Sequence, residues 1–162
     1  MVLISFDSGI ERTGYAVFIL DKGDYSLQSY GCLFTSAKDS TEKRINSLHV
    51  QVSELIKLHS PSAFVLERLF FSVNKKTAIV VAQAQGTVLQ LAGLHDISVD
   101  FLTPNEIKLS MTGYGNADKK SVQKMVMLTL GLDVAPEPDD TADAIACGLT
   151  YCTMKALYDR QT

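Results

Sequence analysis

Apolar residues recur along the first 34 positions with the spacing of β-strands. Three runs rich in β-branched and aromatic residues are separated by turn sequences, at Asp7-Ser8-Gly9 and at residues 21–24. The runs are Val2–Phe6, Gly14–Leu20 and Tyr25–Phe34. This pattern predicts a three-stranded antiparallel meander at the start of the chain.

Beyond residue 40 the apolar positions take up helical spacing, interrupted by two short apolar runs. The first helix is expected after a cap formed by Asp39 and Glu42, and Ser60-Pro61 ends it. The short runs, expected as strands, are Ala63–Leu66 and Ile97–Leu102. Further helices are expected from Ser72 or Asn74 to about Ala92, in a short turn from Pro104, around an apolar face over 122–130, and from about Asp140 to Leu157. The order predicts an α/β fold, a mixed sheet covered by helices on both faces.

One glycine interrupts the helix expected before Ala92. Gly86 lies in its interior, where glycine costs roughly 1 kcal/mol relative to alanine. Close packing against another helix, from the same chain or from a second subunit, would explain it.

Length and composition favour a single domain over residues 1–162. The apolar content of 46% and the net charge of −3 exclude a disordered chain. The sequence has no run of about 18 apolar residues, so no membrane span is expected. The opening MVLISFD has no basic leader, and Cys32, Cys147 and Cys152 lack the spacing of a disulfide framework or a zinc site. The cytoplasm is therefore the expected location. The mild acidity by itself argues against a nucleic-acid partner.

Four carboxylates stand where strands end or a helix begins. Asp7 and Glu67 each follow an apolar strand, and if those strands are parallel neighbours both acids emerge at one edge of the sheet. Asp140 and Asp143 are three positions apart, so they project from one face of the last helix. Ionised carboxylates that face one another repel unless divalent cations lie between them, and oxygen ligands suit Mg²⁺ or Mn²⁺ better than Zn²⁺. Two such ions about 4 Å apart support an in-line phosphoryl displacement.

These acids also have ordinary structural explanations. Asp7 is typical of a turn, and Asp139, Asp140 and Asp143 are typical of helix capping. Glu67 is harder to explain in this way, because an acid directly after an apolar strand lies near the core, where acids are rarely buried unpaired. The residues alone leave both interpretations open.

At these acids the sequence resembles the RuvC Holliday junction resolvases of the ribonuclease H-like superfamily, from residue 1 to about residue 157. Four segments carry the resemblance in the family's order and spacing: FDSGIERTGYAV, LERLFF, VQKMV following GYGNADKK, and DTADAIACGL. The resemblance implies a five-stranded ribonuclease H-like sheet. Two departures are Ser8, where the family usually has proline, and Arg68, where glutamine is common. Arg68 is a candidate to alter the position of Glu67.

The resemblance also assigns roles to these residues. It implies two Mg²⁺ ions per site, with Mn²⁺ as an alternative, and it leaves Asp139 outside the ligand set. The implied ligands are Asp7, Glu67, Asp140 and Asp143. The family places lysines matching Lys108 and Lys119 by the scissile phosphate, so Lys119 joins the acids as a catalytic candidate. The remaining DNA-contact candidates are Phe70, for stacking on an unpaired base, and Arg12, Lys75, Lys76 and Lys120, for the backbone.

The implied activity is resolution of four-way DNA junctions by paired symmetric nicks, in recombination and repair. Resolution needs two symmetric nicks and each chain has one site, so a twofold homodimer is implied. The helix from Asn74 to Ala92 is the candidate dimer face. A branch-migration helicase is a further candidate partner. Two divalent ions would take the net charge from −3 to about +1 in the two-metal arrangement, which weakens the objection from acidity.

Three alternatives stay open. One is a related nuclease that acts on a flap or an RNA–DNA hybrid. Another is a junction-binding protein without catalysis, against which the complete set of four acids argues. The third is a nucleotide-handling ATPase, because Asp7-Ser8-Gly9 also resembles the phosphate loop of actin-like kinases. Those kinases need a second domain to enclose the nucleotide, and 162 residues leave no room for one.

Overall fold

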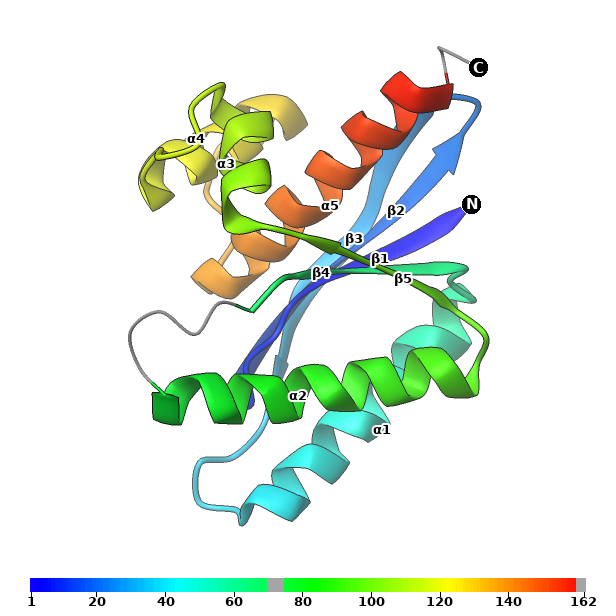
Figure 1. The fold of residues 1–162 in the computed structure, drawn as a ribbon, viewed down its shortest axis with the longest axis vertical. Helices are drawn as coiled ribbons and strands as arrows, with labels where there is room; N and C mark the ends of the chain where they lie inside the picture. Colours follow the sequence, from blue (N-terminus) through cyan, green and yellow to red (C-terminus); the bar gives the residue numbers. More distant parts are fainter. Residues whose placement is uncertain (70–74, 160–162) are drawn as a thin grey trace.

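The computed structural model describes residues 1–69 and 75–159, and at 75–77 it describes the main chain alone. The elements in order are β1 (Val2–Asp7), β2 (Arg12–Asp21), β3 (Asp24–Phe34), α1 (Thr41–His59), β4 (Ala63–Glu67), α2 (Lys75–Leu94), β5 (Ser98–Leu102), α3 (Pro104–Thr112), α4 (Lys119–Leu130) and α5 (Asp139–Asp159). Figure 1 shows α1 and α2 on one side of the strands and α3, α4 and α5 on the other. The predicted α/β architecture with helices on both faces is confirmed.

The strands of the described residues form one five-stranded sheet in the order β3-β2-β1-β4-β5. β1 pairs antiparallel with β2, and β2 pairs antiparallel with β3, which confirms the predicted meander. β1 pairs parallel with β4, and β4 pairs parallel with β5. The strands that end in Asp7 and Glu67 are therefore parallel neighbours, which was the condition for both acids to share one edge.

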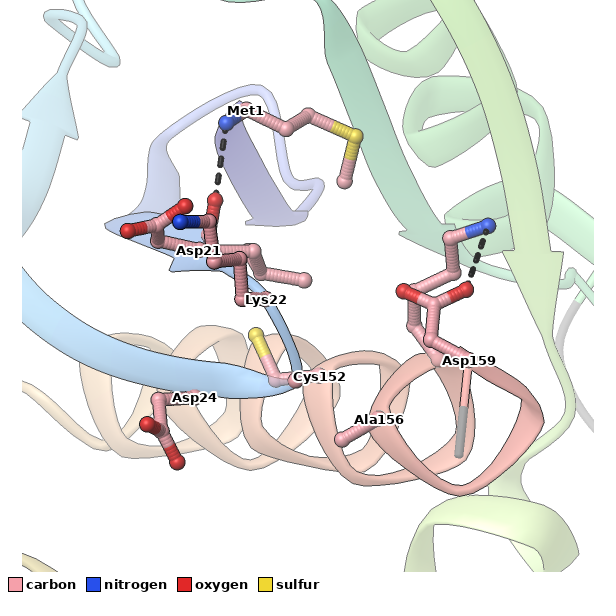
Figure 2. A pocket seen from close by; sticks show the side chains of 10 residues that line it. Met1, Asp21, Lys22, Asp24, Cys152, Ala156 and Asp159 are labelled. Carbon is pink, nitrogen blue, oxygen red and sulfur yellow. Dashed lines mark hydrogen bonds and ion pairs between the residues drawn. The ribbon is translucent and has the colours of Figure 1, made fainter. Parts of the chain in front are cut away.

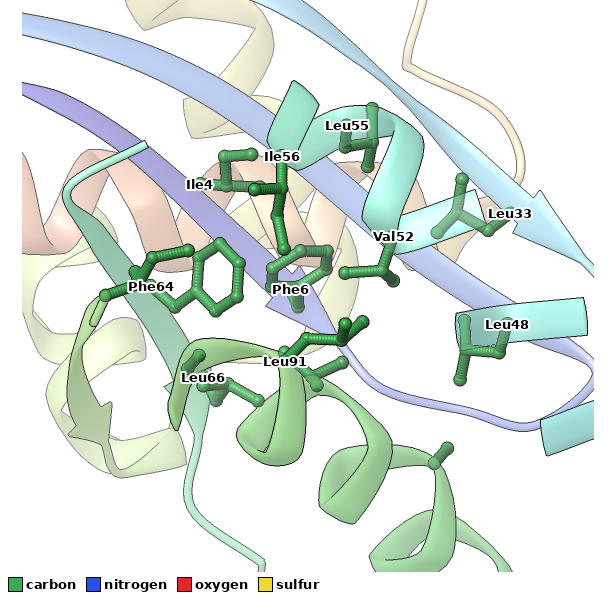
Figure 3. Close-up of a cluster of buried hydrophobic side chains, with 14 of the residues drawn as sticks. Ile4, Phe6, Leu33, Leu48, Val52, Leu55, Ile56, Phe64, Leu66 and Leu91 are labelled. Carbon is green, nitrogen blue, oxygen red and sulfur yellow. The ribbon is translucent and has the colours of Figure 1, made fainter. Parts of the chain in front are cut away.

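One face of the sheet is covered by α1 and α2. The rings of Phe6 and Phe64 meet edge to face at 5.1 Å between centroids, which is a favoured geometry for an aromatic pair. Around this pair Figure 3 shows side chains of β1, β4, α1 and α2 directed into a common core. The amphipathic helix α1 contributes its apolar face to this core. The buried residues of α1 are Leu48, Val52, Leu55 and Ile56.

The other face is covered chiefly by α5, which packs very close to the strands. The Ser5 hydroxyl donates a hydrogen bond of 2.7 Å to the main-chain carbonyl of Ala144. A Cβ atom on Gly148 would lie 2.2 Å from the Phe18 ring, so only glycine fits there. This close packing fixes the first turns of α5 against β1 and β2.

Two local expectations differ from the structure. The N-cap of α1 is Ser40, whose hydroxyl bonds to Glu42, and not Asp39. The short turn expected at Pro104 is a nine-residue helix, α3, which begins with a complete capping box of Thr103 and Glu106. The caps expected for α2 at Ser72 or Asn74 lie outside the described residues. Within the described ranges, no helix has the length and apolar character needed to cross a bilayer.

Candidate active site at the carboxyl edge of the sheet

Asp7 and Glu67 lie beside each other at the carboxyl edge of two parallel strands. The register pairs Phe6 of β1 with Leu66 of β4, and the two acids are the next residues on each strand. Glu67 in turn pairs with Leu102 of β5. The prediction that sheet topology would bring these two acids together is confirmed.

The first turn of α5 adds Asp140 and Asp143 to this edge. The helix can come so close because β2 has a glycine at the contact: a Cβ atom on Gly14 would lie 1.9 Å from the Asp140 carbonyl oxygen. Asp143 and Glu67 line the same cavity, of about 260 Å³. The four predicted carboxylates therefore lie close enough to influence one another's charge, although they come from three separate elements.

Burial and mutual repulsion shift the ionisation of this cluster. Burial, followed by the negative charges of Asp143, Glu67 and Asp140, raises the pKa of Asp7 to about 8. Burial is also the main cause that raises the pKa values of Glu67, Asp140 and Asp143 above their ordinary range. Acids with raised pKa values in a cleft are typical of functional sites. Without a counter-charge, this edge of the sheet resists full ionisation.

Two cationic side chains partly supply that counter-charge. Arg12 Nε lies 2.9 Å from Asp140 Oδ2, and Lys119 Nζ lies 2.6 Å from Asp143 Oδ2. Both cations also approach Asp139, at 3.5 Å from Arg12 and 2.7 Å from Lys119. Burial alone would lower the pKa of Lys119, but hydrogen bonds to Asp139 and Asp143 outweigh it and raise that pKa. The acid cluster is thus bordered by cations before any nucleic acid is present.

Three cavities open around the cluster. Lys108 and Lys119 line the one shared by Glu67 and Asp143. A second, of about 280 Å³, is lined by Asp7, Glu67 and neighbouring residues of α2. The third, of about 580 Å³, is lined by residues that include Arg12 and Asp140. Together the three cavities are lined by all four acids.

The side chains of His, Cys, Asp and Glu in residues 1–69 and 75–159 include no group of three that could hold a metal ion as they stand. Arg12 and Lys119 each lie against one oxygen of Asp140 and Asp143, respectively. Asp140 Oδ2 is buried and receives no well-directed hydrogen bond, even though Arg12 Nε is near. Oxygen donors that repel one another, with one left unsatisfied, fit a divalent cation once the side chains turn toward it.

Of the other predicted DNA-contact residues, only Lys120 has a described side chain. Lys120 is exposed at the start of α4. Phe70 lies outside the described residues, and so do the side chains of Lys75 and Lys76 in the first turn of α2. Asp139 has cationic contacts that the sequence did not predict. The only signal in the sequence was the position of Asp139 next to Asp140, and that position did not indicate its cationic partners.

The two departures from the family pattern leave the acids in place. The Arg68 guanidinium lies over the Phe101 ring, 5.8 Å from its centroid, and no ion pair joins it to Glu67 among the described residues. The expectation that Arg68 alters the position of Glu67 therefore has no support in the observed contacts. Ser8 has a buried hydroxyl without a hydrogen-bond partner in the described structure.

Another pocket lies at the opposite end of α5. Figure 2 shows Met1 and Asp21 on one side of it and Cys152, Ala156 and Asp159 of α5 on the other, and its volume is about 270 Å³. The 21 residues of α5 span roughly 30 Å, so this pocket is remote from Asp140. It contributes nothing to the acid cluster.

The mixed sheet, its strand order and the acids at its carboxyl edge define an α/β protein of the ribonuclease H-like class. The sequence model of crossover junction endodeoxyribonuclease RuvC matches residues 3–151. This chain therefore belongs to the RuvC family.

Individual relatives agree with this assignment. A crossover junction endodeoxyribonuclease RuvC of Dictyoglomus thermophilum is 44% identical over 151 residues, which cover 93% of this chain and 96% of the relative. The Thermus thermophilus RuvC structure superposes with a TM-score of 0.87 at 30% identity, covering 98% of both chains. The structure of T. thermophilus RuvC in complex with a Holliday junction substrate gives a TM-score of 0.85 at 28% identity, covering 97% of this chain and 96% of that one.

Proposed function

We propose that this chain is a structure-selective DNA endonuclease that resolves four-way junctions by paired symmetric nicks, in recombination and repair. The observation that carries the proposal is the cluster of Asp7, Glu67, Asp140 and Asp143 at the carboxyl edge of the sheet in a chain of the RuvC family. Relatives over nearly the whole chain are named crossover junction endodeoxyribonucleases, and a similar structure holds a Holliday junction. This match favours nuclease chemistry over a nucleotide-handling ATPase.

The four acids are proposed to hold two Mg²⁺ ions, with Mn²⁺ as an alternative. Support comes from the all-oxygen donor set, from the buried Asp140 oxygen and from the raised pKa of Asp7, because a divalent cation would relieve the repulsion among these groups. When bound, the ions would activate water and stabilise the leaving oxygen of a phosphodiester. Asp7 and Glu67 would orient the ions from the rigid sheet, and Asp140 and Asp143 would close the site from α5.

The cations around the cleft are proposed to act on the phosphate. Lys108 and Lys119 line the same cavity as Glu67 and Asp143, where a positive charge would offset the negative charge that develops on the phosphoryl group. Arg12 and Lys120 are proposed to bind the DNA backbone, which orients the substrate without reading its sequence. Phe70, Lys75 and Lys76 stay predictions for base stacking and backbone binding.

A twofold homodimer is proposed to bring two such sites to one junction. The interior of α2 supports it: a Cβ atom on Gly86 would meet no described atom within 4 Å, so no contact in these parts of the chain explains the glycine. Ile79, with 57% exposure, lies on the same helix. A helix with an open glycine and an exposed apolar residue suits packing against its copy in a second subunit. A single domain over residues 1–162, a cytoplasmic location and a branch-migration helicase as partner complete the proposal.

The deciding experiment compares three labelled substrates in Mg²⁺: a synthetic four-way junction, a flap and an RNA–DNA hybrid duplex. Selective, symmetric nicking of the junction is the expected result. Preferred cleavage of the flap or the hybrid would assign a different nuclease activity. Tight junction binding without any nick, in Mg²⁺ and in Mn²⁺, would instead assign a non-catalytic junction-binding protein.

A further inference from the structure

Asp139 is the acid at the start of α5 that the family resemblance does not assign, and it has two cationic partners. Its Oδ2 lies 2.7 Å from Lys119 Nζ, and its Oδ1 lies 3.5 Å from Arg12 Nη2. These cations come from α4 and from the start of β2, so Asp139 joins two elements that border the acid cluster. With 45% of its side chain exposed, Asp139 does not need these partners to offset a cost of burial.

The same two cations also contact the two proposed ligands on α5. Lys119 Nζ lies 2.6 Å from Asp143 Oδ2, and Arg12 Nε lies 2.9 Å from Asp140 Oδ2. The five side chains therefore form a row of alternating charge, in the order Asp140, Arg12, Asp139, Lys119, Asp143. Asp139 is the acid at its centre, and it contacts both cations.

Divalent cations bound by Asp140 and Asp143 would repel Arg12 and Lys119, because like charges a few ångströms apart destabilise one another. Among the three acids of the row, Asp139 would then be the one left to hold both side chains. We infer that Asp139 is a positioning residue, which retains Arg12 and Lys119 at the edge of the cleft when Asp140 and Asp143 turn to the metal. This inference rests on the metal site of the proposed function.

Loss of Asp139 is expected to affect metal binding even when no DNA is present. Without it, the anionic partners left to Lys119 and Arg12 in the row are the ligand carboxylates themselves. The two cations would then compete with the metal for Asp140 and Asp143. Residues that orient metal ligands in this indirect way typically change metal affinity by about 10–100-fold when they are replaced.

The test is a double-mutant cycle on Mg²⁺ affinity, measured by calorimetry on metal-free protein without DNA. Asp139→Asn is expected to bind Mg²⁺ about tenfold more weakly than the wild type. In a Lys119→Gln background the same substitution is expected to cost about threefold or less, because the main competing cation is gone. A simple loss of one nearby negative charge would give the same tenfold cost in both backgrounds and would overturn the inference.

Control variants separate positioning from folding and from net charge. Asp133→Asn removes an exposed acid from the loop before α5 and is expected to keep wild-type affinity. Asp139→Glu is expected to restore affinity because it restores the carboxylate. If Asp139→Asn does not fold, Asp139→Ser gives the same comparison, because it also removes the carboxylate. A wild type that binds no Mg²⁺ contradicts the proposed metal site, whereas equal losses in both backgrounds contradict the role of Asp139 alone.

Discussion

Gly14 of β2 lies directly against the main chain of Asp140 in α5. An added Cβ atom would be 1.9 Å from the Asp140 carbonyl oxygen and 2.4 Å from the carbonyl carbon. A main-chain group cannot swing aside as a flexible side chain does, so α5 would have to move away from the sheet. The absence of a side chain at this position thus lets a proposed metal ligand approach the strand that pairs with β1.

We expect Gly14→Ala to lower the free energy of unfolding by about 3 kcal/mol, at the upper end of the usual cost of overpacking. Junction cleavage should fall as well, since Asp140 would be displaced. Urea unfolding measures the first effect. Gly115→Ala is the control, because an added Cβ atom there is 3.9 Å from its nearest neighbour, and its stability should stay within about 0.5 kcal/mol of wild type. Equal stability of the two variants would contradict the close contact.

Removal of a proposed metal ligand should abolish cutting and spare binding. For Asp7→Asn and Glu67→Gln we expect junction cleavage in Mg²⁺ to fall about 1,000-fold or more, because several kcal/mol of charge stabilisation are lost. Junction affinity in a gel-shift assay should change little. Asp24→Asn and Glu54→Gln remove the same charges from exposed positions and should cleave normally. Near-normal cleavage by either ligand variant would contradict the metal site.

Asp7 should also make the stability of the metal-free protein depend on pH. Its pKa is raised from 3.8 to about 8, first by burial and then by Asp143, Glu67 and Asp140. As pH rises above about 4 the unfolded chain releases this proton while the folded protein keeps it, so stability falls until pH reaches about 8. The decrease due to Asp7 is expected to be on the order of 6 kcal/mol.

Urea unfolding in EDTA at several pH values tests this, with Asp7→Asn as the reference. The difference between wild type and variant isolates Asp7 from other titrating groups. Mg²⁺ added at high pH should restore stability to the wild type, because the cation favours the ionised carboxylates. A wild type that gains stability relative to Asp7→Asn as pH rises in EDTA would show that Asp7 is not held in its protonated form.

The proposed dimer predicts a change of mass on substitution in α2. Ile79→Glu places a charge on the proposed contact, so sedimentation should show a monomer where the wild type is a dimer. Leu128→Glu on α4 is the matched control, since Leu128 is 65% exposed on a helix outside the proposed interface. A dimer that persists in Ile79→Glu but dissociates in Leu128→Glu would move the interface to α4.

The local sequence was sufficient to predict most of the secondary structure. Strands at Val2, Gly14 and Ala63 follow from dense β-branched and aromatic runs bounded by turn residues, and their observed limits differ by a few residues at most. The length of α3 was underestimated. Its buried contacts at Ile107 and Met111, which join it to α5 and α4, extend the helix beyond its initial turn.

The sequence by itself determined which chemical groups are present and in what order: a carboxylate after each of two apolar strands and two more on one face of a helix. Only the tertiary structure decided which of them meet. The order β3-β2-β1-β4-β5 brings Asp7 beside Glu67 across 60 residues of chain. The close packing of α5 on Gly14 then adds Asp140 and Asp143. The pairing of Lys119 with Asp139 could not be predicted from spacing, because such contacts depend on how α4 and α5 pack and not on any local periodicity.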